Sequence, residues 1–195
     1  IKTAYATAYT RLLLLVKSGA IGKVVSVDAT CTSLMGTVPA DNLVDRWNSI
    51  TAWGPTALLP VFQILGTEYI DKHIFSQYLD KEKKFDGFTK IDFIYPEAVA
   101  SIKVAKAAKS EGNLVITGTE GYIYVPAPWW KTDYFEVKYE NQNMNKRLFY
   151  QLEGEGIRYE LVAFSKAIES EKNSSYVSEE VSVAIAKIID ECEKH

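Results

Sequence analysis

Residues 113–125 read NLVITGTEGYIYV. Two candidate strands, 113–118 and 121–125, flank the tight connection Gly118-Thr119-Glu120-Gly121, which suits antiparallel neighbours. This stretch therefore predicts two neighbouring antiparallel strands.

More strands are predicted on both sides of this stretch. The clearest is 133–140, where Phe135, Val137 and Tyr139 alternate with charged residues at the period of two of a strand with one wet face. The same alternation runs through 25–32, where Val25, Val27, Ala29 and Cys31 are the apolar members. The other candidate strands are 70–79, 88–95, 98–106 and 146–152.

Helical spacing marks both ends of the chain. Tyr5, Tyr9, Leu12 and Val16 recur at the helical period, and Gly19 suits the C-terminal cap. Two closing helices show the same 4, 3, 4 spacing, and Ser178 suits the N-cap of the last. Their apolar positions are Ile157, Leu161, Phe164 and Ile168, then Val181, Ile185, Ile188 and Cys192.

A further helix is predicted in the middle of the chain. It should begin at Gly54-Pro55 and run to Leu65, with a kink at Pro60, after a loop over residues 35–49. Strands in one run with helices at both ends predict an α+β fold: one large, mostly antiparallel open sheet with helices packed on one face. We expect residues 1–195 to form a single domain.

Composition excludes several classes of function. Twenty-two Lys and Arg against 25 Asp and Glu give a formal net charge of −3 in 195 residues, which excludes nucleic-acid binding as the main role. Two cysteines and two histidines exclude a His-rich zinc site, and we expect no metal site and a cytoplasmic location. Cys31 with His73 as a nucleophile pair stays open beside a buried cysteine and a surface histidine.

The chain is not expected to enter a membrane. Its apolar runs are shorter than a membrane span, and Arg11 interrupts the N-terminal apolar stretch that would otherwise resemble a signal peptide. Because the chain begins at Ile1 and not at Met, we expect a processed product or a fragment.

Four segments are candidates for binding. Trp130, with Trp129 after a proline-rich turn, could form a stacking wall for a sugar or a partner, or pack a loop over the sheet. Arg46 could clamp a substrate carboxylate or hydroxyl pair, or form a surface ion pair. Lys103, Lys106 and Lys109 favour the wet face of a strand over an anion site.

The fourth segment, Gly154-Glu155-Gly156, has the setting of a dinucleotide-binding loop. Tyr159 stands where the third glycine belongs, and Glu153 would repel a pyrophosphate. This segment therefore favours a flexible turn, and the chain carries no visible nucleotide cradle.

In this order the segments resemble the C-terminal domain of the Gfo/Idh/MocA oxidoreductases, the NAD(P)-dependent sugar and inositol dehydrogenases. The similarity covers nearly the whole chain, with motifs at Tyr9-Thr10-Arg11-Leu12, Lys17-Ser18-Gly19, Ile21-Gly22-Lys23-Val24-Val25-Ser26-Val27, Gly118-Thr119-Glu120-Gly121-Tyr122-Ile123 and Gly154-Glu155-Gly156-Ile157-Arg158-Tyr159-Glu160. The resemblance implies a longer parent whose upstream Rossmann domain binds NAD or NADP and carries the catalytic lysine. This chain would then supply the sheet, part of the substrate pocket and a homodimer interface through the sheet.

The chain departs from the family on the helix that lines the active site. With Gly54 and Gly66 as anchors, Ala52 stands at the family's Asp position and Thr56 at its His position, so neither can relay a proton. The leading hypothesis is the substrate-binding and dimerisation domain of an oxidoreductase acting on a sugar-like polyol or its ketone. Its predicted substrate-binding residues are Arg46, Trp53, Thr56 and Trp130, with no catalytic residue and no cofactor site in this chain.

Two alternatives to this hypothesis remain open. One is a non-catalytic binding or scaffold protein that kept the fold and lost the relay. The other is a free-standing α+β binding module. On the leading hypothesis this chain alone should not turn over substrate, because hydride transfer needs the cofactor held against the substrate.

Overall fold

The chain folds around one eight-stranded sheet. A computed structural model describes residues 1–34, 47–154, 156–170 and 175–194. In these ranges the strands follow the order β2-β3-β4-β1-β5-β6-β7-β8. They are β1 (Val24–Thr32), β2 (Asp71–Asp80), β3 (Phe85–Ile94), β4 (Val99–Ala105), β5 (Leu114–Gly118), β6 (Tyr122–Val125), β7 (Tyr134–Lys138) and β8 (Lys146–Phe149).

The sheet is antiparallel except where β1 pairs with β4. That pair is parallel, with Ala29 opposite Ile102, because the chain crosses over the sheet between the two strands through a helix. The predicted α+β class with one mostly antiparallel open sheet is therefore confirmed, and each predicted strand lies within a few residues of an observed one.

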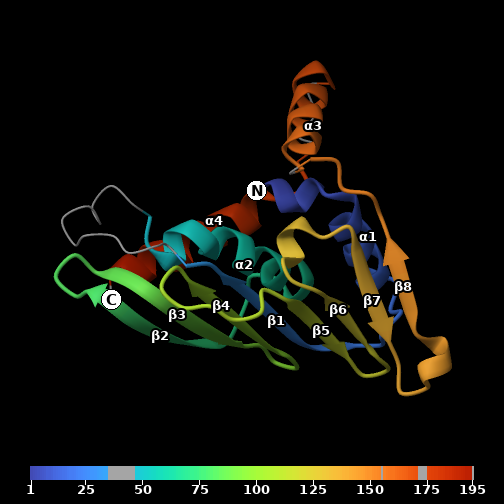
Figure 1. The fold of residues 1–195 in the computed structure, drawn as a ribbon, viewed down its shortest axis with the longest axis horizontal. Helices are drawn as coiled ribbons and strands as arrows, with labels where there is room; N and C mark the ends of the chain where they lie inside the picture. The colour runs from blue at the N-terminus through green and yellow to red at the C-terminus, as the bar shows by residue number, and fades with distance from the viewer. Residues whose placement is uncertain (35–46, 155, 171–174, 195) are drawn as a thin grey trace.

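Helices gather on one face of the sheet, and the opposite face is open (Figure 1). They are α1 (Thr7–Lys17), α2 (Ser49–Leu65), α3 (Ile157–Ser170) and α4 (Glu179–Lys194), with the 3-10 turns η1 (Lys2–Tyr5), η3 (Trp129–Lys131) and η4 (Gln142–Met144). Buried apolar residues of β1, β3 and β4 meet buried residues of α2, which lies on these strands. This layer between sheet and helices is the core, where burial of apolar side chains stabilises the fold.

The central helix begins five residues before the position that the sequence suggests. Asn48 caps α2, because its side chain accepts a hydrogen bond from the Thr51 amide at 2.9 Å. The helix continues through both prolines to Leu65, so Gly54 lies inside it and not at its start. A Cβ at Gly54 would lie 3.0 Å from the Ile50 side chain on the same helix, so the missing side chain leaves room for Ile50, whereas Ile189 of α4 would be at an ordinary contact distance of 3.6 Å.

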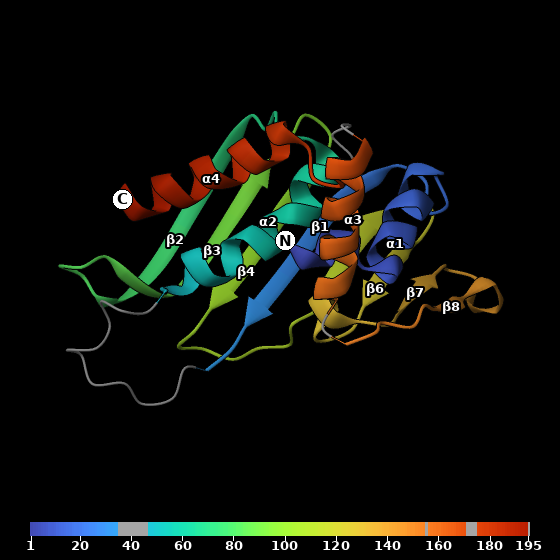
Figure 2. The ribbon, with the colours of Figure 1, turned by 90° about the horizontal axis from the view of Figure 1, so that it is seen from above.

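The two closing helices differ in how they pack. In α4 the predicted apolar positions are buried, and Ser178 caps the helix through the Val181 amide at 3.2 Å. In α3 the predicted apolar positions are exposed, and the helix stands away from the helical layer beside the N-terminus (Figures 1 and 2). The helical spacing of α3 is therefore confirmed, whereas its apolar residues do not join the core.

Candidate functional site

Two predicted site residues, Trp53 and Trp130, lie against one another. Trp53 comes from α2 and Trp130 from η3, and their ring centroids are 4.8 Å apart at an interplanar angle of 53°. The Trp53 indole N–H donates to Ser33 Oγ at 3.1 Å, just beyond the end of β1. The two rings are half-buried, so part of each faces solvent.

The neighbouring Trp129 anchors this pair. Trp129 is 2% exposed, and its indole N–H donates to the Thr30 carbonyl oxygen at 3.1 Å. Its backbone amide donates to the Gly112 carbonyl at 3.0 Å. Of the two predicted roles of the tryptophan dipeptide, Trp129 therefore packs the loop on the sheet, while Trp130 is left at the surface.

Gly112 leaves the space in which the Trp130 ring lies. A Cβ at this position would lie 2.8 and 2.9 Å from two atoms of that ring, closer than side-chain carbons approach one another. The absence of a side chain at Gly112 thus sets how closely Trp130 can approach the strand end.

Hydrogen bonds that include a lysine join the segments next to Ser33 and Gly112. Thr32 Oγ1 donates to the Ser110 carbonyl at 2.9 Å and accepts from the Ser110 amide at 3.1 Å. The Lys109 ammonium donates to the carbonyls of Thr32 at 3.3 Å and Ser110 at 3.1 Å. We call Ser33, Trp53, Lys109 and Trp130 the tryptophan site. It offers aromatic faces, one hydroxyl and one cation, groups that suit a hydroxylated ligand.

Of the other two predicted site residues, one lies near Trp53 and one is not described. Thr56 lies one turn after Trp53 on α2 and is half-buried, and Ala52 precedes Trp53 on the same helix. Arg46 lies outside the described residues. Sequence reasoning missed Ser33, because a serine just beyond a strand carries no local signal. It placed Lys109 on a strand, whereas β4 ends at Ala105 and Lys109 lies beyond it.

Cys31 and His73 are far apart in the sheet. Cys31 lies on β1 and His73 on β2, with β4 and β3 between these strands. Cys31 is fully buried among apolar residues, and burial raises the pKa of its thiol, whereas His73 is exposed. The alternative of a Cys–His nucleophile pair is therefore wrong.

The three regularly spaced lysines do not form one surface. Lys103 lies on β4 between the buried Ile102 and Val104, so its side chain is on the open face, as the strand interpretation predicts. Lys106 follows the end of β4, and its ammonium donates to the Trp47 carbonyl at 2.9 Å.

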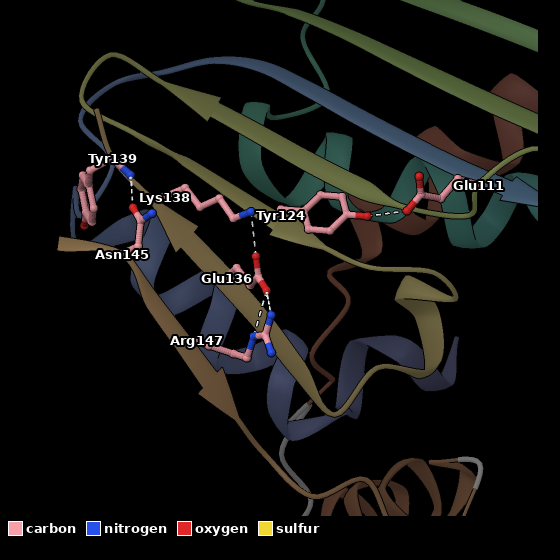
Figure 3. A network of polar contacts seen from close by, with 7 residues as sticks. All are labelled: Glu111, Tyr124, Glu136, Lys138, Tyr139, Asn145 and Arg147. Atoms are coloured by element: carbon pink, nitrogen blue, oxygen red, sulfur yellow. Dashed lines mark hydrogen bonds and ion pairs between the residues drawn. The ribbon is translucent and has the colours of Figure 1, made fainter. Parts of the chain in front are cut away.

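The open face carries a polar network on β6, β7 and β8 (Figure 3). Glu136 accepts from Lys138 at 2.9 Å and from Arg147 Nε at 2.8 Å, and Arg147 lies opposite Glu136 in the β7–β8 register. These two cations lower the pKa of the Glu136 carboxyl, Lys138 more than Arg147. The hydrogen bond from the Tyr124 hydroxyl to Glu111 raises the pKa of Tyr124 to about 12.

The glycine turn before α3 does not fit a dinucleotide. β8 ends at Phe149 and α3 begins only at Ile157, so the turn does not join a strand directly to a helix. Glu153 is negatively charged, as a pyrophosphate is, and would repel it; its carboxylate is paired with Arg158. The described residues also hold no group of three or more His, Cys, Asp or Glu side chains that could bind a metal, and no helix there could cross a membrane.

Comparison with known proteins identifies the fold. No family model and no curated protein matches the chain. Among solved structures, aldose-aldose oxidoreductase from Caulobacter crescentus, complexed with glycerol, is 13% identical with a TM-score of 0.79, over 100% of this chain and 59% of its own. An oxidoreductase from Thermotoga maritima is 18% identical with a TM-score of 0.76, over 99% and 58%. A levoglucosan dehydrogenase in complex with NADH and levoglucosan is 15% identical with a TM-score of 0.78, over 99% and 61%.

The chain has the fold of these oxidoreductases. It spans about three fifths of the length of each solved chain that it matches. The resemblance to the C-terminal domain of Gfo/Idh/MocA oxidoreductases is confirmed at the level of the fold.

Proposed function

We propose that this chain is the substrate-binding and dimerisation domain of a longer, cytoplasmic NAD(P)-dependent oxidoreductase that acts on a sugar-like polyol or its ketone. The contact between Trp53 and Trp130 carries the proposal. It presents two half-buried aromatic faces, of which Trp53 is bonded to the Ser33 hydroxyl, and the Lys109 ammonium is bonded to the adjoining Thr32 carbonyl. Aromatic faces with a few polar groups suit a ligand that is apolar on its ring faces and hydroxylated at its edges.

The cofactor, NAD or NADP, would be held upstream of Ile1. The turn at Gly154 carries Glu153 and lacks the strand-to-helix geometry of a dinucleotide loop. NAD(P) supplies hydride chemistry when bound. The residues of this chain would bind the sugar and orient its carbinol carbon. Trp53 and Trp130 would stack on the ring, and Ser33 and Thr56 would meet its hydroxyls.

The test is hydride transfer by the longer protein with a panel of glucose, myo-inositol and levoglucosan, using NAD and NADP. We expect Trp53→Leu and Trp130→Leu each to raise KM at least about tenfold, the effect of losing about 1.4 kcal/mol of binding. Trp47→Leu is the control, because its exposed ring is outside the tryptophan site. If Trp53→Leu and Trp130→Leu had the same KM as the Trp47→Leu control, the two tryptophans would not bind the sugar. Micromolar binding of NADH or NADPH by the 195-residue chain alone would contradict the upstream cofactor site.

A scaffold function is the second candidate. Ala52 and Thr56 favour it, because they occupy the positions at which the family carries an Asp and a His. If the longer protein binds a polyol and shows no hydride transfer with either cofactor, this second candidate is favoured. Hydride transfer that survives Thr56→Ala but is lost on changing an upstream lysine favours the enzyme.

We also propose a homodimer through the open face of the sheet. Phe75, Val99 and Phe149 are each at least half exposed on that face. The ordered charges around Glu136 would lie at its border (Figure 3). Sedimentation of the 195-residue chain should give a dimer, and Phe149→Glu should weaken it. A monomer at high micromolar concentration would contradict this interface.

A further inference from the structure

One side of α3 is an apolar stripe that no described residue covers. Ile157, Leu161, Phe164 and Ile168 are exposed by 53, 59, 64 and 63%. They repeat at the helical period over about 16 Å of helix, so they form one continuous surface. An apolar surface of this length on a single helix is typical of an interaction site.

The adjoining side of α3 holds the helix on the protein. Glu160, Ala163 and Ala167 are only partly exposed and lie about a quarter turn from the stripe. α3 contacts η1, the first turn of the chain (Figure 2). A helix of 14 residues that rests on a narrow, alanine-lined side gains little from packing, and helices of this length are marginal in water by themselves. Most of the apolar surface of α3 therefore lies in the stripe, and burying the stripe would stabilise the helix more than its present contacts do.

The contact of α3 with η1 indicates what covers the stripe. η1 is the first turn of this chain and contacts α3, so a residue preceding Ile1 in a longer protein would enter the domain beside α3. The solved chains of the same fold extend well beyond the matched region, which is 59% of one and 61% of another, or about three fifths. A longer protein of that size would bring a second domain to this point of the surface.

We propose that the apolar stripe of α3 is the docking surface for the segment that precedes Ile1 in the longer protein. The inference rests on the proposed function, because that function places a nucleotide-binding domain upstream. Docking would fix α3, and through the contact between α3 and η1 it would fix the junction between the two domains. The two parts of the proposed active site would then be held at a constant spacing.

Hydrogen–deuterium exchange of α3 tests this docking. In the 195-residue chain the amides of α3 should exchange rapidly, and in the longer protein they should exchange at least about tenfold more slowly, because docking opposes local opening. Equal exchange in the two proteins would overturn the inference. Protection of α3 in the 195-residue chain that grows with protein concentration would also overturn it, since a second copy would then cover the stripe.

Two variants separate docking from a general effect on folding. Phe164→Ser should return exchange of α3 in the longer protein to the rate of the 195-residue chain, and Leu161→Ala should do so in part. Neither should shift the Tm of the 195-residue chain by more than about 1 °C, because both side chains are exposed there. Leu14→Ser is the matched control, since Leu14 is also an exposed apolar residue of a helix, 59% exposed on α1, and it should leave the exchange of α3 unchanged. If the control variant alone lost the protection of the α3 amides, docking on the stripe would be contradicted.

Hydride transfer by the same longer protein separates this inference from the proposed function. Turnover of a polyol with an unprotected α3 would overturn the docking and leave the function standing. A protected α3 in a protein without turnover would support the docking and contradict the function.

Discussion

Replacing Gly112 by alanine should displace Trp130 and open the tryptophan site. The added Cβ would lie 2.8 Å from the Trp130 ring, so the ring must move by about 0.6 Å to reach ordinary contact distance. Overpacking of this kind costs about 1–3 kcal/mol, and a weakened contact between the two tryptophans adds about 0.5–1.5 kcal/mol. The lower entropy of the unfolded alanine chain returns about 0.4–1 kcal/mol. Together these three effects predict that Gly112→Ala lowers the free energy of unfolding by about 0.5–4 kcal/mol.

A double-mutant cycle assigns this loss to the ring. In a Trp130→Leu background the indole is gone, so Gly112→Ala should be neutral or slightly stabilising. Urea unfolding of the four proteins gives the four free energies, and near-ultraviolet circular dichroism reports the tryptophan contact. An equal penalty in both backgrounds would refute the reasoning, because the alanine would then clash with something other than Trp130.

Three further replacements probe the rest of the structure. Asp86 on β3 is buried and accepts a hydrogen bond from the Thr89 hydroxyl at 2.6 Å, and burial raises the pKa of its carboxyl. Stability that depends on its protonated form is lost as pH rises through that pKa, so urea unfolding should show Asp86→Asn gaining on the wild type from pH 3 to pH 7, and a pH-independent difference would contradict this. Arg147→Gln should lower the free energy of unfolding only slightly at low salt and not at all at 1 M NaCl, because the pair with Glu136 is at the surface and is screened by salt. A loss of stability in the same unfolding measurement that does not depend on salt would contradict this. Trp129→Phe should lower the free energy of unfolding by about 1–3 kcal/mol, because the Thr30 carbonyl loses its hydrogen-bond donor in a buried position. An unchanged midpoint of thermal or urea unfolding would show that this hydrogen bond does not stabilise the loop.

Local patterns were sufficient to predict most of the sheet. Strands such as β7 alternate between the core and solvent, and that period of two is visible in a few residues. The start of α2 was not predictable in this way. Gly54-Pro55 has the composition of a helix start, whereas the observed cap at Asn48 depends on an amide three residues later and on the burial of Ser49.

The tryptophan site illustrates the same limit. Sequence analysis selected Trp53 and Trp130 separately, but their contact depends on the strand order, which brings η3 to the end of β1 and to α2. The amphipathic pattern of α3 likewise predicts a helix without specifying what covers its apolar side. Phe164 has the spacing of a core residue and is nevertheless 64% exposed in this chain.

The most direct test of the proposed sugar site is an NMR titration of the tryptophan indoles in the longer protein. The chain has four tryptophans, whose indole N–H signals can be assigned by single replacements. On adding a polyol that the protein turns over, the signals of Trp53 and Trp130 should shift, while the buried Trp129 and the exposed Trp47 should not. Saturating polyol that leaves Trp53 and Trp130 unchanged would show that the sugar binds elsewhere.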